Sequence, residues 1–197
     1  MTPVEIPLFP LNTVLFPGGV LPLRIFETRY LDMVSRCMKE ASGFAVLAIV
    51  EGQEAGQVTQ FQAVGTLARI VDFDRLDDGL LGITNRGEQR VQVVSQWTQP
   101  DRLLVGKVAL IPPDSATPLL KQHAPLVELL RNILEREELQ FYTRLLDEEW
   151  DNAVWVGNRL AELLPLPIEA KQLLLELNEP MQRLDLLQIV LRDQQTI

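Results

Sequence analysis

Short apolar runs separated by turn signals fill the first 113 residues of the chain, and this pattern is typical of β-strands. Gly18-Gly19 and Asp77-Asp78-Gly79 suit tight connections between such strands. Residues 51–62 are polar, so we expect an exposed loop there that returns to a strand near Phe61. The expected strands cover residues 4–9, 21–25, 44–50, 64–73, 80–84, 91–97 and 103–111. A series of short strands of this kind indicates a barrel or a sandwich.

Several prolines interrupt the apolar runs of the N-terminal segment, among them Pro7, Pro10 and Pro22. Proline has no N–H group to donate to a neighbouring strand, so these strands are expected at edges, bends or barrel corners. Because the segment is so apolar, we expect it to pack into the fold.

One helix is expected among the strands, over residues 28–41, where the spacing of apolar positions changes to the helical period. Its apolar stripe consists of Tyr30, Val34, Cys37 and Ala41. We assign Leu31 and Val34 to the buried face, and we expect Cys37 to act as a small buried apolar residue. Gly43 follows as a plausible C-terminal stop.

After Pro113 the pattern becomes helical, with leucines at helical spacing. The expected helices contain residues 126–134, 151–164, 168–177 and the segment that begins at Pro180. Pro125 predicts a kink or a later start for the first of them. The chain is therefore expected to have a β-rich part, residues 1–113, and a helical part, residues 114–197.

Composition and charge narrow the class of protein. The 197 residues fit one large domain or two small ones, and a single cysteine has no partner for an internal disulfide. A net charge of −9, from 27 acidic and 18 basic residues, disfavours non-specific binding to nucleic acid phosphates. No apolar run approaches the ~20 residues that span a bilayer, and the N-terminus lacks signal-peptide features. We expect a cytoplasmic protein that binds neither nucleic acid nor membrane.

The sequence lacks the motifs of common catalytic sites. It contains no phosphate loop of the G-x-x-x-x-G-K-[ST] type. A Ser-His-Asp triad would depend on His123, the single histidine, for which we favour a surface or capping role, and a zinc site would lack ligands. The acidic groups around Glu137 and Glu148 are interpreted as solvated helix ends. We expect no catalytic residue, no metal and no cofactor.

Three segments contain motifs that resemble those of a known protein family. Residues 7–27 are rich in proline and lead into Phe26-Glu27-Thr28-Arg29-Tyr30, residues 64–93 contain Val64-Gly65-Thr66 and Arg86-Gly87-Glu88, and residues 160–167 end in Leu164-Pro165-Leu166-Pro167. Together they resemble the N-terminal domain of Lon-type ATP-dependent proteases, and more closely the small stand-alone bacterial proteins made of that domain. The family usually has proline where this chain has Thr28, and either residue is tolerated at a helix start.

The resemblance implies an α+β fold, with a PUA-like β-barrel that contains an inserted helix and is followed by a C-terminal α-helical bundle. It implies a non-catalytic recognition module for unfolded polypeptide or a protein partner, without the family's ATPase and serine–lysine protease modules. We expect an apolar peptide to bind between the barrel and the helical part, with a barrel edge as a site for strand addition. The alternatives are a small-molecule-binding protein with a pocket at the barrel/helical junction and a peptidase.

The candidate contact residues come from the family-like segments. They are Arg24, Phe26, Arg29, Tyr30, Arg69, Arg86 and Arg90. The resemblance implies that the arginines contact a partner at the surface, where their planar guanidinium groups suit carboxylates and backbone carbonyls, while the two aromatic residues supply apolar contact. The alternative is internal ion pairing of these arginines, for example with Glu27 or Asp32.

Overall fold

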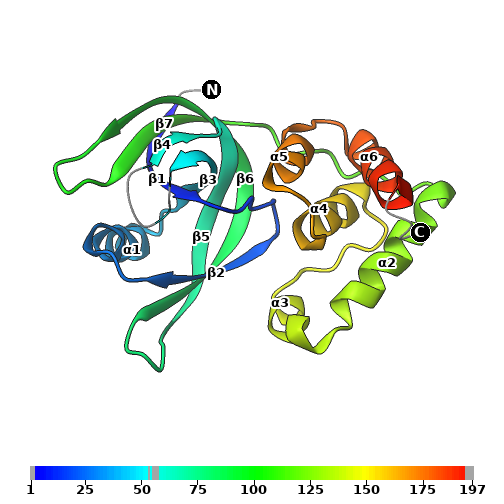
Figure 1. Ribbon diagram of the computed structural model, residues 1–197, viewed down its shortest axis with the longest axis horizontal. Helices are drawn as coiled ribbons and strands as arrows, with labels where there is room; N and C mark the ends of the chain where they lie inside the picture. The colour runs from blue at the N-terminus through cyan, green and yellow to red at the C-terminus, as the bar shows by residue number, and fades with distance from the viewer. Residues whose placement is uncertain (1–2, 53, 55–57, 194–197) are drawn as a thin grey trace. The chain divides into compact units, whose positions relative to one another are not determined.

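The computed structural model describes residues 3–52, 54 and 58–193 of the chain. The fold is mixed α+β, and the chain divides into two compact units, Met1–Pro112 and Pro113–Ile197 (Figure 1). Each unit is described by itself. Within the described residues, no helix combines the length and the apolar character needed to cross a membrane.

The N-terminal unit is built on one seven-stranded sheet with α1 (Thr28–Glu40) between its second and third strands. The strands are β1 (Val4–Leu11), β2 (Val20–Ile25), β3 (Phe44–Gly52), β4 (Val58–Phe61), β5 (Val64–Arg75), β6 (Leu81–Thr98) and β7 (Leu104–Leu110). Their order is β1-β7-β6-β5-β3-β4, with β2 paired to β6. β1 also pairs with β3, in parallel, so the strand order returns to its first member.

The prolines of β1 are explained by the way this strand changes partner. Val4–Pro7 pairs with β7, and Leu8–Leu11 pairs with β3. Each half of β1 therefore has one hydrogen-bonded neighbour among the described strands, which leaves a side of the strand where a missing N–H group does no harm. Pro22 lies in β2, which pairs with β6 alone in this part of the chain.

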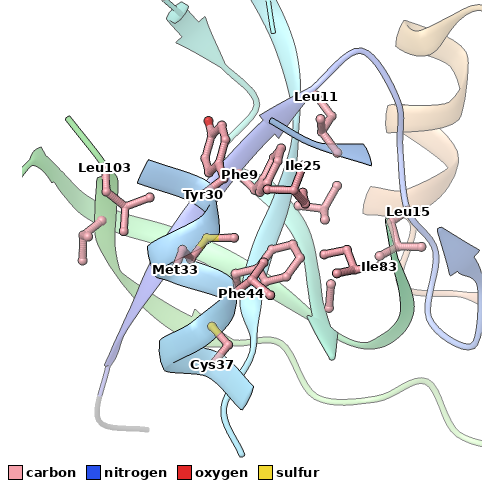
Figure 2. Close-up of a cluster of buried hydrophobic side chains, with 14 residues drawn as sticks. Phe9, Leu11, Leu15, Ile25, Tyr30, Met33, Cys37, Phe44, Ile83 and Leu103 are labelled. Carbon is pink, nitrogen blue, oxygen red and sulfur yellow. The ribbon is translucent and has the colours of Figure 1, made fainter. Parts of the chain in front are cut away.

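β3 separates two apolar clusters and supplies side chains to both. Phe44 and Val46 enter one cluster, and Ala45 and Leu47 enter the other, as expected from the alternation of side chains along a strand. The first cluster also contains Phe9, Ile25, Ile83 and the buried face of α1 (Figure 2). All four β3 residues are at most 1% exposed, so this part of β3 is buried on both faces.

The buried face of α1 differs in part from the predicted one. Tyr30, Val34 and Cys37 are buried as predicted, but Leu31 is 38% exposed and Met33 is fully buried in its place. The prediction for Leu31 is therefore wrong. Successive helical residues are rotated by about 100°, so Leu31 lies beside the buried stripe and not on it. Met38, which shares the edge of the helix with Leu31, is 42% exposed.

The C-terminal unit is helical, with α4 as its central element. Its helices are α2 (Ala124–Leu134), α3 (Gln140–Arg144), α4 (Ala153–Leu163), α5 (Ile168–Glu176) and α6 (Pro180–Asp193). α4 packs against α2, α5 and α6, and eight of its residues are buried. Asn152 caps its N-terminus by accepting a 3.0 Å hydrogen bond from the Val154 N–H group. α2 begins at Ala124, with Pro125 in its first turn, and α3 was not predicted.

Charged and polar side chains are buried between these helices. Arg183 of α6 donates to the carbonyls of Leu174 and Leu177 at 2.9 and 2.7 Å and pairs with Asp114 at 3.1 Å. His123 is fully buried, and its Nε2 lies 2.8 Å from Oδ1 of Asp185. Of the predicted surface or capping role, the surface part is therefore wrong. His123 stands at the N-cap position of α2 without a side-chain capping hydrogen bond, and Asp185 of α6 supplies a carboxylate partner for its ring.

Candidate functional site

An open groove of about 760 Å³ lies in the N-terminal unit, beside the first turn of α1. We call it the α1 groove. It is lined by Pro10 of β1, by residues 26–30 at the start of α1, by Thr98 at the end of β6, and by Asp101, Arg102 and Leu104 of the β6–β7 connection and β7. The groove is thus formed where three separate segments of the chain meet.

The start of α1 exposes one aromatic side chain at this groove. Ile25 ends β2 with its side chain 2% exposed in the core, and the following residue, Phe26, is 58% exposed. Glu27 then has an extended backbone, and its carbonyl accepts hydrogen bonds from the N–H groups of Tyr30 and Leu31 at 3.0 Å. The passage from strand to helix therefore leaves Phe26 outside both the sheet and the helical turn.

A second part of the groove is a tight turn between β6 and β7. Its backbone is closed by hydrogen bonds of 2.8 Å from Gln99 N–H to the Leu103 carbonyl and from Arg102 N–H to the Gln99 carbonyl. The carboxylate of Asp101 accepts a 2.9 Å hydrogen bond from Leu103 N–H. Arg102 has φ 66°, a left-handed conformation that is unfavourable for residues other than glycine.

Arg29 links the two parts of the groove. Its Nε donates to Glu27 at 2.8 Å, its Nη1 donates to the backbone carbonyl of Arg102 at 3.1 Å, and its guanidinium lies 4.7 Å from the centre of the Tyr30 ring. Only 19% of the Arg29 side chain is exposed. Arg29 is therefore chiefly an internal link, and the premise that it is an exposed arginine is wrong.

Tyr30 forms the floor of the groove and belongs to the apolar core. It is 7% exposed, and its ring stacks on Phe9 with centres 4.0 Å apart (Figure 2). Burial raises the pKa of its phenol, against the opposing effect of the nearby Arg29 charge. The phenol is therefore neutral at physiological pH.

The structure brings three of the seven predicted site residues together in the α1 groove: Phe26, Arg29 and Tyr30. The other four lie along β2, β5 and β6, which are adjacent strands of the sheet. Arg24 pairs with Asp78 in the β5–β6 turn, and not with Glu27 or Asp32 as the internal alternative suggested.

The other three candidate arginines lie in the strands β5 and β6. Arg69 forms a bidentate ion pair with Glu88, in which Nε and Nη2 donate to the two carboxylate oxygens at 2.5 and 3.3 Å. This pair raises the pKa of Arg69. The Arg69 guanidinium also donates to the Ala41 carbonyl. Arg86 lies directly across from Arg69 in the β5–β6 register and is half-buried. Arg90 is 4% exposed, so its guanidinium is not available on the surface of the unit.

Three groove residues with charged side chains, Glu27, Asp101 and Arg102, were not predicted as site residues. The sequence Gln99-Pro100-Asp101-Arg102 carries a turn signal, because proline and aspartate favour turns. That signal locates a loop, but only the pairing of β6 with β7 brings the loop to the first turn of α1.

A second, smaller hollow of about 270 Å³ lies on the other end of α1. It is lined by Cys37, Met38, Ala41, Ser42 and residues 69–73. Cys37 is 2% exposed, and burial raises the pKa of its thiol, as expected for a core residue. No group of His, Cys, Asp and Glu side chains suited to a metal ion occurs among the described residues.

A family model described as the ATP-dependent protease La (LON) substrate-binding domain matches residues 5–193. The chain belongs to the family of Lon substrate-binding domains. This confirms the resemblance found in the sequence, and the match includes both compact units.

Known members of the Lon family agree with this assignment. The chain is 32% identical to Lon protease 2 of Herpetosiphon aurantiacus over 96% of its own length. It covers 24% of that relative, and 21 to 22% of the Lon proteases of Anaeromyxobacter dehalogenans and Syntrophobacter fumaroxidans, so it spans about a quarter or less of their length.

Solved structures are similar over almost the whole chain. The crystal structure of a Lon N-terminal domain protein from Xanthomonas campestris has 38% sequence identity and a TM-score of 0.77, with 94% of this chain and 98% of that chain covered. The N-terminal domain of a Mycobacterium avium complex Lon protease has a TM-score of 0.62 at 20% identity, which supports the fold alone.

Proposed function

We propose that this Lon substrate-binding domain is a non-catalytic recognition module that holds a segment of unfolded polypeptide or of a protein partner in the α1 groove. The observation that carries the proposal is Phe26, a large aromatic side chain exposed at the mouth of an open groove. Aromatic side chains dominate the energetics of protein contacts, because they bury a large area at a small cost in conformational entropy.

The other groove residues suit an extended chain. Pro10, Tyr30 and Leu104 supply apolar surface along the groove, and Arg29 fixes the two parts of the groove relative to each other. In this proposal apolar contacts with Phe26 provide most of the affinity. The arginine chiefly keeps the groove in shape.

The proposal includes a closed barrel of the PUA-like kind for residues 1–113 and a helical domain for residues 114–197. The pairing of β1 with both β7 and β3 supports closure of the sheet. A closed sheet holds the first turn of α1 on a rigid support, which preserves the groove when no client is bound.

Binding of fluorescently labelled, unfolded casein tests the proposal. Phe26→Ala is expected to weaken binding about tenfold, the loss typical of an aromatic anchor. Phe73→Ala is the matched control, since Phe73 is 57% exposed and lies outside the α1 groove. Equal affinities of wild type and Phe26→Ala overturn the proposal, and a loss confined to Phe73→Ala moves the site to the hollow beside Cys37.

The non-catalytic part of the proposal has its own test. Purified protein is incubated with unfolded casein, with and without ATP, and the casein is followed by gel electrophoresis. Casein is expected to stay intact in both samples. Cleavage that elutes with the protein peak overturns this part of the proposal.

A further inference from the structure

The charges around the α1 groove point to the kind of segment that it selects. We propose that the groove prefers segments in which an aspartate or glutamate side chain follows an aromatic residue, and that Arg102 recognises the carboxylate. This inference rests on the proposed function and names the substrate class of the same groove. Arg102 is the residue that distinguishes such segments from neutral ones.

All but one of the charged side chains that line the groove have a partner within the protein. Glu27 is occupied by Arg29 at 2.8 Å. Asp101 accepts the Leu103 N–H group and lies 4.0 Å from Arg36. Glu54, whose charge acts on Tyr30, lies outside the lining and accepts the Asn12 N–H group.

Arg102 is the exception. Its side chain is exposed, and within the described part of the chain no side chain or carbonyl forms an ion pair or hydrogen bond with its guanidinium. The groove therefore offers one positive charge that the protein does not neutralise. A carboxylate of the bound segment is the complementary group, because its two oxygens match the planar guanidinium.

The backbone of Arg102 is held while its side chain is not. Its N–H group donates to Gln99, and its carbonyl accepts from Arg29. These two hydrogen bonds hold the backbone of Arg102 at φ 66°. The side chain therefore extends from a Cα atom whose position is fixed. A side chain presented from a fixed backbone loses less conformational freedom on binding than one on a mobile loop.

Phe26 and Arg102 line the same groove and come from two different segments of the chain. A segment that buries an aromatic side chain against Phe26 has its neighbouring residues near the β6–β7 turn. A side-chain carboxylate on such a neighbour gains a charge-assisted hydrogen bond, whereas an amide gains only a neutral one, so we expect a preference of about three- to tenfold.

Three labelled peptides of equal length test the inference. The first contains Phe-Glu at its centre, the second contains Phe-Gln there, and both are amidated at the C-terminus. The third contains Phe-Gln and ends in a free carboxylate. Dissociation constants are measured by fluorescence anisotropy for wild type, Arg102→Gln and Arg75→Gln. Arg75 is the matched control, since it is an exposed arginine outside the groove.

Wild type and Arg75→Gln are expected to bind the Phe-Glu peptide about three- to tenfold more tightly than the amidated Phe-Gln peptide. Arg102→Gln is expected to lose this preference and to bind the amidated Phe-Gln peptide as wild type does. Equal binding of the two peptides by wild type, or a preference that persists in Arg102→Gln, overturns the inference but not the proposed function.

Three further outcomes complete the test. If the peptide with the free C-terminus binds as tightly as the Phe-Glu peptide, the groove recognises a chain end, and the proposed side-chain preference is wrong. If wild type binds none of the three peptides while it binds unfolded casein through Phe26, only the inference about Phe-Glu segments fails. If casein binding fails as well, the proposed function fails with it.

Discussion

The guanidinium of Arg29 donates a 3.1 Å hydrogen bond to the backbone carbonyl of Arg102, 73 residues further along the chain. This contact joins the first turn of α1 to the β6–β7 turn, and the α1 groove lies between the segments that it connects. It also helps to hold Arg102 in a left-handed conformation, with φ 66°. The geometry of the groove therefore depends on Arg102, whose left-handed backbone conformation is unfavourable for a residue with a side chain.

Arg102→Gly is expected to raise the free energy of unfolding by up to about 1 kcal/mol. Glycine adopts positive φ without the steric cost of about 1–2 kcal/mol that other residues incur, although it loses more backbone entropy on folding. The carbonyl that accepts from Arg29 is retained. Urea denaturation measures the change, and Arg102→Ala, which keeps the unfavourable φ, is the control with stability near wild type. A lower midpoint for the glycine variant than for the alanine variant contradicts this prediction.

Met33→Ala is expected to lower the free energy of unfolding by about 2–5 kcal/mol, the range for truncation of a fully buried side chain. Met33 is 0% exposed in the core beneath α1. Leu31→Ala is the matched comparison, and at 38% exposure it is expected to lose less than about 1.5 kcal/mol. Equal losses in the two variants, measured by denaturant midpoints, argue against the orientation of α1 described above.

The alkaline limit of stability is expected to depend on the two tyrosines of the chain, Tyr30 and Tyr142. Burial raises the pKa of both phenols, and for Tyr142 the charge of Glu162 adds to this effect. Below pH 10 both phenols are protonated in the folded and the unfolded chain. Above pH 10 the unfolded chain releases protons that the folded chain retains, so stability falls as pH rises, by up to about 1.4 kcal/mol per pH unit for each tyrosine.

Ultraviolet absorbance of tyrosinate checks this prediction directly. Ionisation is expected to coincide with the loss of circular dichroism as pH rises, whereas the chain in urea ionises near the ordinary phenol value. Burial lowers the pKa of Lys171 below its ordinary value of 10.5. As pH rises toward 10.5, the folded chain loses this proton more readily than the unfolded chain, so the contribution of Lys171 to stability increases with pH, opposite to that of the tyrosines. Tyrosinate absorbance that rises near pH 10 in a chain that is still folded contradicts the prediction.

Arg183→Met is expected to lower the free energy of unfolding by about 3–5 kcal/mol, since it removes one partner of a buried ion pair, in which the Asp114 side chain is 7% exposed. Arg192→Met removes an exposed arginine from the same helix and is expected to change stability by less than about 0.5 kcal/mol. The pair Arg183→Met with Asp114→Leu is expected to recover part of the loss, because no unpaired charge remains. Thermal unfolding of the three variants measures these changes in stability. Equal losses of stability in Arg183→Met and Arg192→Met count against a stabilising role of the buried ion pair.

Much of the local structure follows from periodicity. Alternation and turn signals predict the strands, and the helical stripe of Tyr30, Val34 and Cys37 predicts the helix between them. β6 shows where this approach fails, because residues 85–90 look polar and separate two expected strands, yet Leu81–Thr98 is continuous. Asn85 and Arg90 are buried there, and Asn85 donates to the Leu21 carbonyl at 3.0 Å. The amide group of Asn85 finds this partner on the neighbouring strand β2, and the pattern of a single strand does not contain that information.

The sequence by itself determined the α+β composition, the family-like motifs and the place of Phe26 between a strand and a helix. Tertiary structure alone decided which segments meet. It paired Arg24 with Asp78, buried His123 beside the carboxylate of Asp185, and brought the β6–β7 turn to the first turn of α1. The physical reason is that periodicity indicates on which face of its own helix or strand a residue lies. A groove is formed by segments that are distant in the sequence, and their approach depends on strand register and on core packing.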